Sequence, residues 1–222
     1  MPMLSQFTND IVGCAVSVAL AGGYYVYLHW RTAHHDRLYT VQAINAEARR
    51  LWVDSVMAER RDILAVQTLR NSTMAATFLA STAVLLIIGV LSLADHGRDF
   101  EHALHALNVT GAVDPGLWIV KLLALVLDLC LAFFSFTQAV RAFNHTGYLL
   151  NVPLAAAPKI VTPGYVSEVL NRAARHYSVG MRAYYFTVPL LFWLFGPHLM
   201  VAATAGLVLL LYRIDRAPDA GN

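Results

Sequence analysis

Long apolar runs constrain this chain more than any other feature of its sequence. Several runs extend over about 20 residues, and a helix of that length crosses the hydrocarbon core of a bilayer. Because no water pairs with backbone amides there, only helices and closed barrels can span it. Of the 222 residues, 58% are hydrophobic and 14% are charged, and the mean hydropathy is +0.53. The sequence therefore predicts an all-α integral membrane protein.

Three apolar runs are each predicted to be one membrane-spanning helix, and a fourth region is longer than one span requires. This region, residues 184–212, contains Gly196 and Pro197 near its middle, so it forms either one span or a hairpin of two. We expect a bundle of about five transmembrane helices, or four if the region is a single span. The predicted spans cover about residues 10–30, 73–94, 117–140, 179–195 and 197–213.

Basic residues are unevenly distributed between the predicted loops. The loop between the second and third spans holds only Arg98, whereas the loop between the first two spans holds Arg31, Arg37, Arg49, Arg50, Arg60, Arg61 and Arg70. Short loops rich in arginine stay in the cytoplasm. A bend at Gly196 places Arg213 and Arg216 on the same side, which favours the hairpin. We therefore expect a multi-pass protein of the plasma (inner) membrane, with its N-terminus outside and its C-terminus in the cytoplasm.

Two long cytoplasmic helical segments are predicted, at residues 38–70 and 163–182. The first lacks glycine and proline and is expected to continue the second span into the cytoplasm. We expect its apolar face to pack against a helix of the same chain or of a neighbouring subunit, and binding to anionic lipid is the alternative. That face comprises Val41, Ile44, Ala48, Leu51, Trp52 and Val56.

The second cytoplasmic segment carries helix-start signals. Thr162 is predicted to be its N-cap and Pro163 to lie in its first turn. Neither segment requires a separate soluble domain, so residues 1–222 are treated as a single transmembrane domain.

Polar residues form a stripe along the third predicted span. Its members, at helical spacing, are Lys121, Asp128, Ser135 and Gln138. An aspartate at the bilayer centre costs roughly 2.5–3.5 kcal/mol on insertion scales, so Asp128 should face protein or water. It is either hydrogen-bonded to a hydroxyl of a neighbouring span or a proton- or cation-binding group in a pathway. The candidate hydroxyl donors are Ser17, Thr77, Ser81 and Thr82.

Lys121 lies near the predicted outer end of the same span. We expect it to extend its ammonium group to the membrane surface, and pairing with a charge on another helix is the alternative. As a member of the stripe, Lys121 is counted with Asp128, Ser135 and Gln138 among the candidates for an ion or proton pathway.

A second polar group gathers at the cytoplasmic ends of the second and third spans. These ends meet if the two spans are antiparallel neighbours. Their positive charges and amides are then suited to hold an anion, and lipid phosphate is the favoured one. The candidate residues are Arg70, Asn71, Arg141, Asn144 and His145.

Other function classes have less support in the sequence. His102 and His105 share a helical face of the predicted outer loop and suit zinc or copper once further ligands close the site, but this spacing is common by chance. No HExxH motif, glycine-rich phosphate loop or nucleophile elbow occurs, so an enzyme is not favoured and no cofactor is expected. A net charge of +2 gives no case for nucleic-acid binding.

Three blocks of the chain resemble a known family. They are RNSTMAATFLAST (residues 70–82), FFSFTQAVRAFNHTGYLL (133–150) and VGMRAYYFTVPLLFWLFGP (179–197). Together they resemble the family with the domain of unknown function 599, DUF599, which comprises membrane proteins of bacteria and plants. The resemblance covers about residues 20–215 and implies no assigned activity. It places Arg182 in a shared framework with Arg70, Asn71, Arg141 and Asn144, and we include Arg182 among the anion candidates.

These patterns lead to three hypotheses about function. The first is an oligomeric channel or small-solute or ion pathway, supported by the polar stripe and by the small residues Gly13, Ser17 and Ala21, which permit close helix contact. The alternative is a scaffold that transports nothing and binds a partner or membrane lipid, including anionic lipid. The third is a metal-dependent membrane enzyme. We expect a homo-oligomer in membrane lipid.

Overall fold

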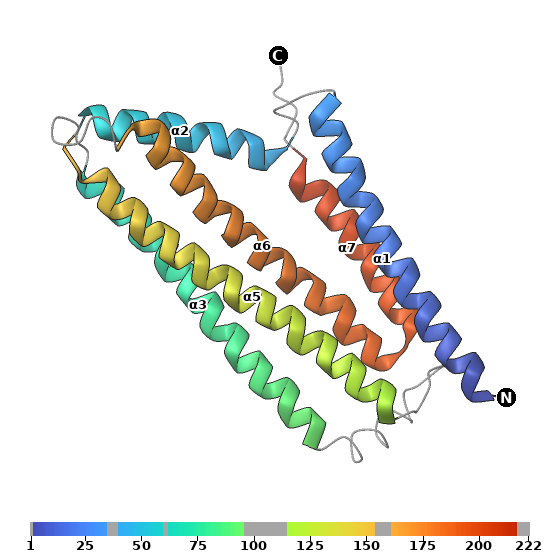
Figure 1. Ribbon diagram of the computed structural model, residues 1–222. Coiled ribbons are helices and arrows are strands. Elements are labelled where there is room, and N and C mark those ends of the chain that lie inside the picture. The colour runs from blue at the N-terminus through green and yellow to red at the C-terminus, as the bar shows by residue number, and fades with distance from the viewer. Residues whose placement is uncertain (1, 35–39, 60–61, 96–114, 154–160, 217–222) are drawn as a thin grey trace.

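The computed structural model describes residues 2–34, 40–59, 62–95, 115–153 and 161–216, and six helices occupy nearly all of them (Figure 1). Their bounds are α1 Pro2–His34, α2 Val41–Glu59, α3 Asp62–Asp95, α5 Pro115–Leu150, α6 Pro163–Phe195 and α7 Pro197–Asp215. The described residues contain no strand, only one antiparallel bridge between Thr40 and Arg216. The prediction of an all-α fold is therefore confirmed.

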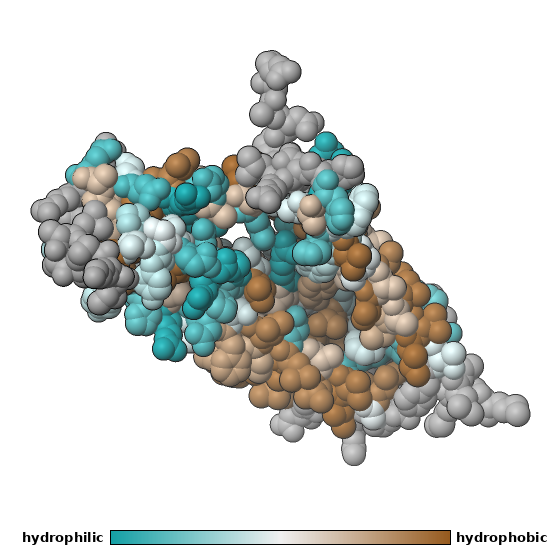
Figure 2. Space-filling view, turned by 45° about the horizontal axis from the view of Figure 1, so that its top comes forward, coloured by the Kyte–Doolittle hydropathy of each residue, from teal (hydrophilic) through white to brown (hydrophobic). Residues whose placement is uncertain are grey.

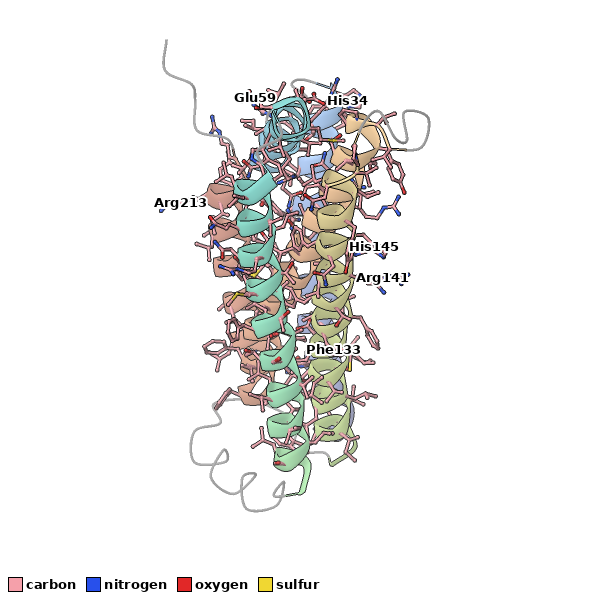
Figure 3. All side chains as sticks on the ribbon, turned by 90° about the vertical axis from the view of Figure 1, so that its left-hand side faces the viewer. His34, Glu59, Phe133, Arg141, His145 and Arg213 are labelled. Atoms are coloured by element: carbon pink, nitrogen blue, oxygen red, sulfur yellow. The ribbon has the colours of Figure 1, made fainter. Side chains whose placement is uncertain are left out.

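Five of these helices lie side by side in a row, and α2 crosses one end of it (Figure 1). The main contacts follow the row: α3 packs on α5, α5 on α6, α6 on α7 and α7 on α1. We call the end crossed by α2 the α2 end and the opposite end, where α6 meets α7, the Gly196 end. His34 and Glu59 both lie at the α2 end (Figure 3). The row therefore has two distinct ends to which each polar residue can be assigned.

Four of the helices are long and apolar enough to cross a membrane. Their apolar segments are Thr8–His34, Ile63–Leu93, Gly116–Leu150 and Pro197–Asp215. Large apolar side chains point outward from them, including Phe78, Leu85 and Leu127. Hydrophilic residues gather at the α2 end, whereas most of the remaining surface in that view is hydrophobic (Figure 2). These surfaces are typical of a membrane-embedded helix bundle.

The region 184–212 is divided between two helices, so it is not one continuous helix. Gly196 separates them with φ 150° and ψ 155°, a conformation that strains residues with a Cβ atom. Its N–H donates to the carbonyl oxygens of Phe192 and Trp193 and closes α6, and Pro197 begins α7. The predicted N-cap of α6 is also confirmed, since the N–H of Tyr165 donates to Oγ1 of Thr162.

The helical segment predicted at residues 38–70 differs from the prediction, because α2 is a helix distinct from α3 and crosses the row (Figure 1). It packs mainly against α6 within the same chain. Its buried residues are Val53, Val56 and Met57, whereas Ile44 and Leu51 are exposed. The expected packing partner is therefore correct, but the predicted apolar face coincides with the buried one only in part: Val56 belongs to both, whereas Val53 and Met57 were not predicted.

The core of the bundle depends on small residues that let helices approach. The ring of Phe136 on α5 is fully buried against α6 at Gly180, where an added Cβ would lie 2.8 Å from the ring. Gly13 on α1 meets Pro197 of α7 just as closely, at 2.8 Å from a Cβ built on the glycine. These contacts fix the register of α5 on α6 and of α1 on α7, and with it the positions of the polar side chains.

Candidate functional site

A buried ion pair lies at the Gly196 end, between α1 and α5. The Nζ of Lys121 lies 3.0 Å from Oδ1 of Asp10, and the indole N–H of Trp193 donates to the same oxygen across 2.8 Å. Lys121 is 4% exposed and Asp10 is 1% exposed. The favoured expectation that Lys121 extends to the membrane surface is therefore wrong, because a carboxylate on another helix holds it in the bundle.

The remaining oxygen of Asp10 is unsatisfied. Oδ2 is buried and accepts no hydrogen bond within the described part of the chain. The carboxylate therefore relies on Lys121 for neutralisation and on Lys121 and Trp193 for its contacts. Lys121 also lies 5.6 Å from the centre of the Trp193 ring, a cation–π contact that ties α5 to α6.

Asp128, in the middle of α5, is hydrogen-bonded to α6. The hydroxyl of Thr187 donates to its Oδ2 across 2.8 Å. The expected donors lie elsewhere, since Thr77 and Thr82 donate to carbonyl oxygens of their own helix, α3. Of the two open interpretations, a hydroxyl contact with a neighbouring helix is observed, although its donor is on α6. Asp128 remains partly exposed and forms no salt bridge among the described residues.

The four residues of the polar stripe all lie on the part of α5 near α6. Lys121 and Asp128 contact Trp193 and Thr187 of that helix, Ser135 is buried, and Gln138 lines a cavity between the two helices. Three of the four are therefore enclosed by neighbouring helices or hydrogen-bonded to them, and only the last faces an open space.

A second charged cluster joins α1, α6 and α7 nearer the α2 end. Asp215 accepts from the hydroxyl of Tyr24 across 2.9 Å and from the guanidinium of Arg182 across 3.0 Å. Arg182 also lies 4.9 Å from the centre of the Tyr25 ring. Its guanidinium is thus engaged by a carboxylate and an aromatic ring, apart from the other residues predicted to hold an anion.

A cavity of about 520 Å³ lies between α5 and α6, and we call it the α5/α6 cavity. Arg141 and His145 enter it from α5, and Arg172 and His176 enter it from α6. Figure 3 shows Arg141 and His145 pointing away from α3. None of the described residues that line it is acidic. The complete lining is Gln138, Arg141, Ala142, His145, Tyr148, Leu149, Tyr165, Val169, Arg172 and His176.

Sequence reasoning found only one wall of this cavity. Gln138, Arg141 and His145 were singled out, but Arg172 and His176 were missed, as was Tyr165. The signal was present as a polar face at helical spacing on α6. It was not recognised because the prediction paired the end of the third span with the second span alone.

A smaller cavity of about 360 Å³ lies on the other side of α5, against α3, and we call it the α3/α5 cavity. Arg70, Thr73 and Asn144 line it, together with Asn151 and Tyr148. Asn71 is exposed on α3 and lines neither cavity. Four of the six predicted anion residues are thus divided between the two cavities, Arg141 and His145 in one and Arg70 and Asn144 in the other, and Tyr148 lines both.

Positive charge also gathers where α2 crosses α6. The Nε of Arg49 donates to Asn171 across 2.7 Å. Burial in this contact lowers the pKa of Arg49, and the nearby positive charge of Arg175 lowers it further. Arg175 in turn pairs with Glu168 at 2.7 Å. The acidic residue nearest in sequence to Arg172 is therefore already neutralised by another arginine.

The metal hypothesis rests on His102 and His105, which lie outside the described residues. Within the described residues, no group of three or more histidine, cysteine or acidic side chains is placed to hold a metal ion.

The apolar helices, with polar contacts between them and cationic cavities at one end, define a multi-pass α-helical membrane protein. The chain belongs to the family described as protein of unknown function, DUF599, whose model matches residues 12–220. The predicted family membership is confirmed. No curated protein and no solved structure matches the chain.

Proposed function

We propose that this protein binds an anionic, phosphate-bearing lipid headgroup in the α5/α6 cavity, at the cytoplasmic surface of the membrane. The observation that carries the proposal is the convergence of Arg141, Arg172, His145 and His176 on one cavity whose described lining contains no carboxylate. Arginine binds phosphate through paired N–H donors, and basic pockets between transmembrane helices suit acidic headgroups. Tyr148 and Tyr165 add hydroxyl groups at the same cavity.

The position of the cavity along α5 supports a lipid as its source of phosphate. Arg141 lies about 30 Å along the helix from Lys121, at a rise of about 1.5 Å per residue. The hydrocarbon core of a bilayer has about the same thickness. With the Lys121–Asp10 pair at one boundary of that core, the cavity lies at the other boundary, where headgroup phosphates are found.

The same reasoning leads us to propose five crossings. α6 contacts α2 through Asn171 at one end and contacts α1 through Trp193 at the other, so it runs between the same two ends as α5 and α7. Its C-terminal half, residues 179–195, is the fifth crossing. Arginines gather at the α2 end, which favours that end as the cytoplasmic one. In this arrangement the protein lies in the plasma (inner) membrane, with its N-terminus outside the cell and its C-terminus in the cytoplasm.

The binding proposal is tested with purified protein in bilayer nanodiscs. We expect acidic phospholipid to be enriched around the wild type, and Arg141→Ala combined with Arg172→Ala to lower its affinity by roughly tenfold or more, since hydrogen bonds to charged groups contribute about 1.5–3 kcal/mol each. Arg213→Ala is the matched control, because Arg213 is exposed and points away from the bundle (Figure 3). Equal binding by the double variant and the control would refute the proposal.

A second arm of this experiment separates lipid from soluble anion. Inorganic phosphate is added to protein in neutral nanodiscs and to protein loaded with acidic lipid. The proposal predicts that physiological phosphate neither stabilises the neutral sample nor displaces the lipid. Saturable stabilisation by phosphate in neutral nanodiscs, with no preference for acidic lipid, would assign the cavity to a soluble anion.

An ion or proton pathway remains the second candidate, and one observation favours it. Asp128 lies in an apolar span and is hydrogen-bonded to a neutral hydroxyl, so no positive charge among the described residues neutralises it. Such a carboxyl is suited to take up a proton or a cation from a path between copies of the chain in a homo-oligomer. Proton or cation flux into liposomes that is abolished by Asp128→Asn would establish this function. Equal flux from wild type, variant and empty liposomes would exclude it.

A further inference from the structure

The two cationic cavities open on the same face of the molecule, on either side of α5. Ala139, Phe143 and Thr146 are buried and mark the inner face of this helix. Arg141, Asn144 and Tyr148 are exposed, and their spacing of three and four residues places them together on the opposite face. We call this exposed row the α5 ridge. The α5/α6 cavity lies along one flank of the ridge and the α3/α5 cavity along the other.

The ridge itself contributes to both cavities. Tyr148, 77% exposed, lines both of them. Arg141 enters the α5/α6 cavity and Asn144 enters the α3/α5 cavity. A ligand that reaches from one cavity into the other therefore crosses α5 over the side chains of Arg141, Asn144 and Tyr148.

The cavities also lie at the same depth. An added Cβ at Gly147 of α5 would lie 3.8 Å from the side chain of Leu69, so Arg70 is at the level of the residues that form the ridge. Leu69 and Phe143 belong to one buried cluster, which places α3 and α5 in this register. Both cavities therefore lie at the same depth in the membrane, where the phosphates of lipid headgroups can reach either of them.

Each cavity is chemically suited to one phosphate. The α5/α6 cavity offers two arginines and two histidines, and the α3/α5 cavity offers Arg70 with the amides of Asn144 and Asn151 and the hydroxyl of Thr73. None of the described residues lining either cavity is acidic. A single phosphate satisfies one cavity and leaves the other, with its arginine, for a second anion.

We infer that the two cavities bind one lipid that carries two phosphates, one phosphate in each cavity, with the linking part of its headgroup lying over Tyr148. This inference rests on the proposed function of the α5/α6 cavity and specifies the class of its ligand. Two phosphates on one molecule bind with the advantage of effective concentration, since the second is held near its cavity once the first is bound. Lipids with one phosphate gain no such advantage.

The test compares two acidic lipids in phosphatidylcholine nanodiscs at equal total phosphate. Phosphatidylglycerol carries one phosphate and cardiolipin carries two, and bound lipid is measured by native mass spectrometry. We expect the wild type to prefer cardiolipin by about tenfold or more. Arg70→Ala should abolish this preference by removing the second phosphate site, while one phosphatidylglycerol still binds in the α5/α6 cavity, because Arg70 lines the α3/α5 cavity and not the α5/α6 cavity.

The variants separate failure of this inference from failure of the proposed function. Equal binding of both lipids by the wild type, or a preference that survives Arg70→Ala, would overturn the inference and leave the proposed function intact. Binding of neither lipid would overturn both. Arg213→Ala is again the control and should retain the preference. Thermal melting of each variant in neutral nanodiscs shows that the variant is folded. In a separate competition, inorganic diphosphate is added at a phosphate concentration equal to that of the bound cardiolipin. Displacement of the cardiolipin would overturn the inference and assign the pair of cavities to a soluble diphosphate.

Discussion

Lys121 and Asp10 form an ion pair inside the helix bundle, with 3.0 Å between Nζ and Oδ1, although one lies on α5 and the other on α1. α1 packs mainly on α7, so this pair gives it an additional attachment to the centre of the row. A buried ion pair is weak evidence of stability as such, but removing one partner leaves an uncompensated charge in an apolar medium. Substituting both partners should therefore cost less stability than substituting one of them.

We expect Lys121→Met to destabilise the folded protein by about 3–5 kcal/mol, because the buried carboxylate of Asp10 then loses the ammonium group with which it pairs. Combining it with Asp10→Asn should recover most of the loss, since the asparagine carbonyl can still accept from Trp193. Unfolding in mixed detergent micelles, followed by circular dichroism, measures both effects. A single variant as stable as the wild type, or a double variant as unstable as the single one, would contradict this account.

Gly180→Ala should destabilise the contact between α5 and α6 by about 1–3 kcal/mol, the usual range for overpacking a core. The new Cβ would lie 2.8 Å from the ring of Phe136, which is fully buried. Adding Phe136→Leu should restore part of the loss. Gly206→Ala is the matched control, because nothing lies within 4 Å of a Cβ there and alanine is the better helix former.

Tyr24→Phe should cost about 1.5–3 kcal/mol, the range for hydrogen bonds to charged groups, since it removes the hydroxyl that donates to Asp215 across 2.9 Å. Asp215→Asn should cost more, because Arg182 then loses its carboxylate partner as well. Unfolding of both variants in the same detergent gives the comparison. Tyr212→Phe, at an exposed position of α7, should change nothing.

Epitope tags on the two ends of the chain should lie on opposite sides of the membrane. Five crossings require this arrangement, whereas four would leave both tags on one side. In intact cells, external protease should remove only the N-terminal tag, and permeabilised cells should lose both. Protection or loss of the two tags together would refute the proposed crossing by residues 179–195.

The helical architecture was predictable because its signals are local. A glycine followed by a proline ends α6 and starts α7 within an apolar region, and Thr162 with Pro163 starts α6. The buried face of α2 was harder to predict, since apolar residues lie on more than one side of that helix. Whether Leu51 or Val53 is the buried residue depends on the angle at which α2 crosses α6, and tertiary packing sets that angle.

The candidate site was predictable only in part, for a related reason. The stripe from Lys121 to Gln138 was visible from its spacing, and so was its need for partners. The partners themselves, Asp10, Thr187 and Arg172, are on helices far away in sequence, and spacing within one helix carries no information about them. Asp10 in particular is the first residue of the first predicted span, where a charged side chain indicates the polar end of a helix and not a partner inside the bundle.

The dependence of α1 on α7 has a consequence for how the molecule assembles. Tyr24 donates to Asp215 and Gly13 packs against Pro197, and both contacts join α1 to α7, which lies far from it in sequence. During synthesis α1 therefore enters the lipid before α7 has been made, and it stays without its main packing partner until α7 follows.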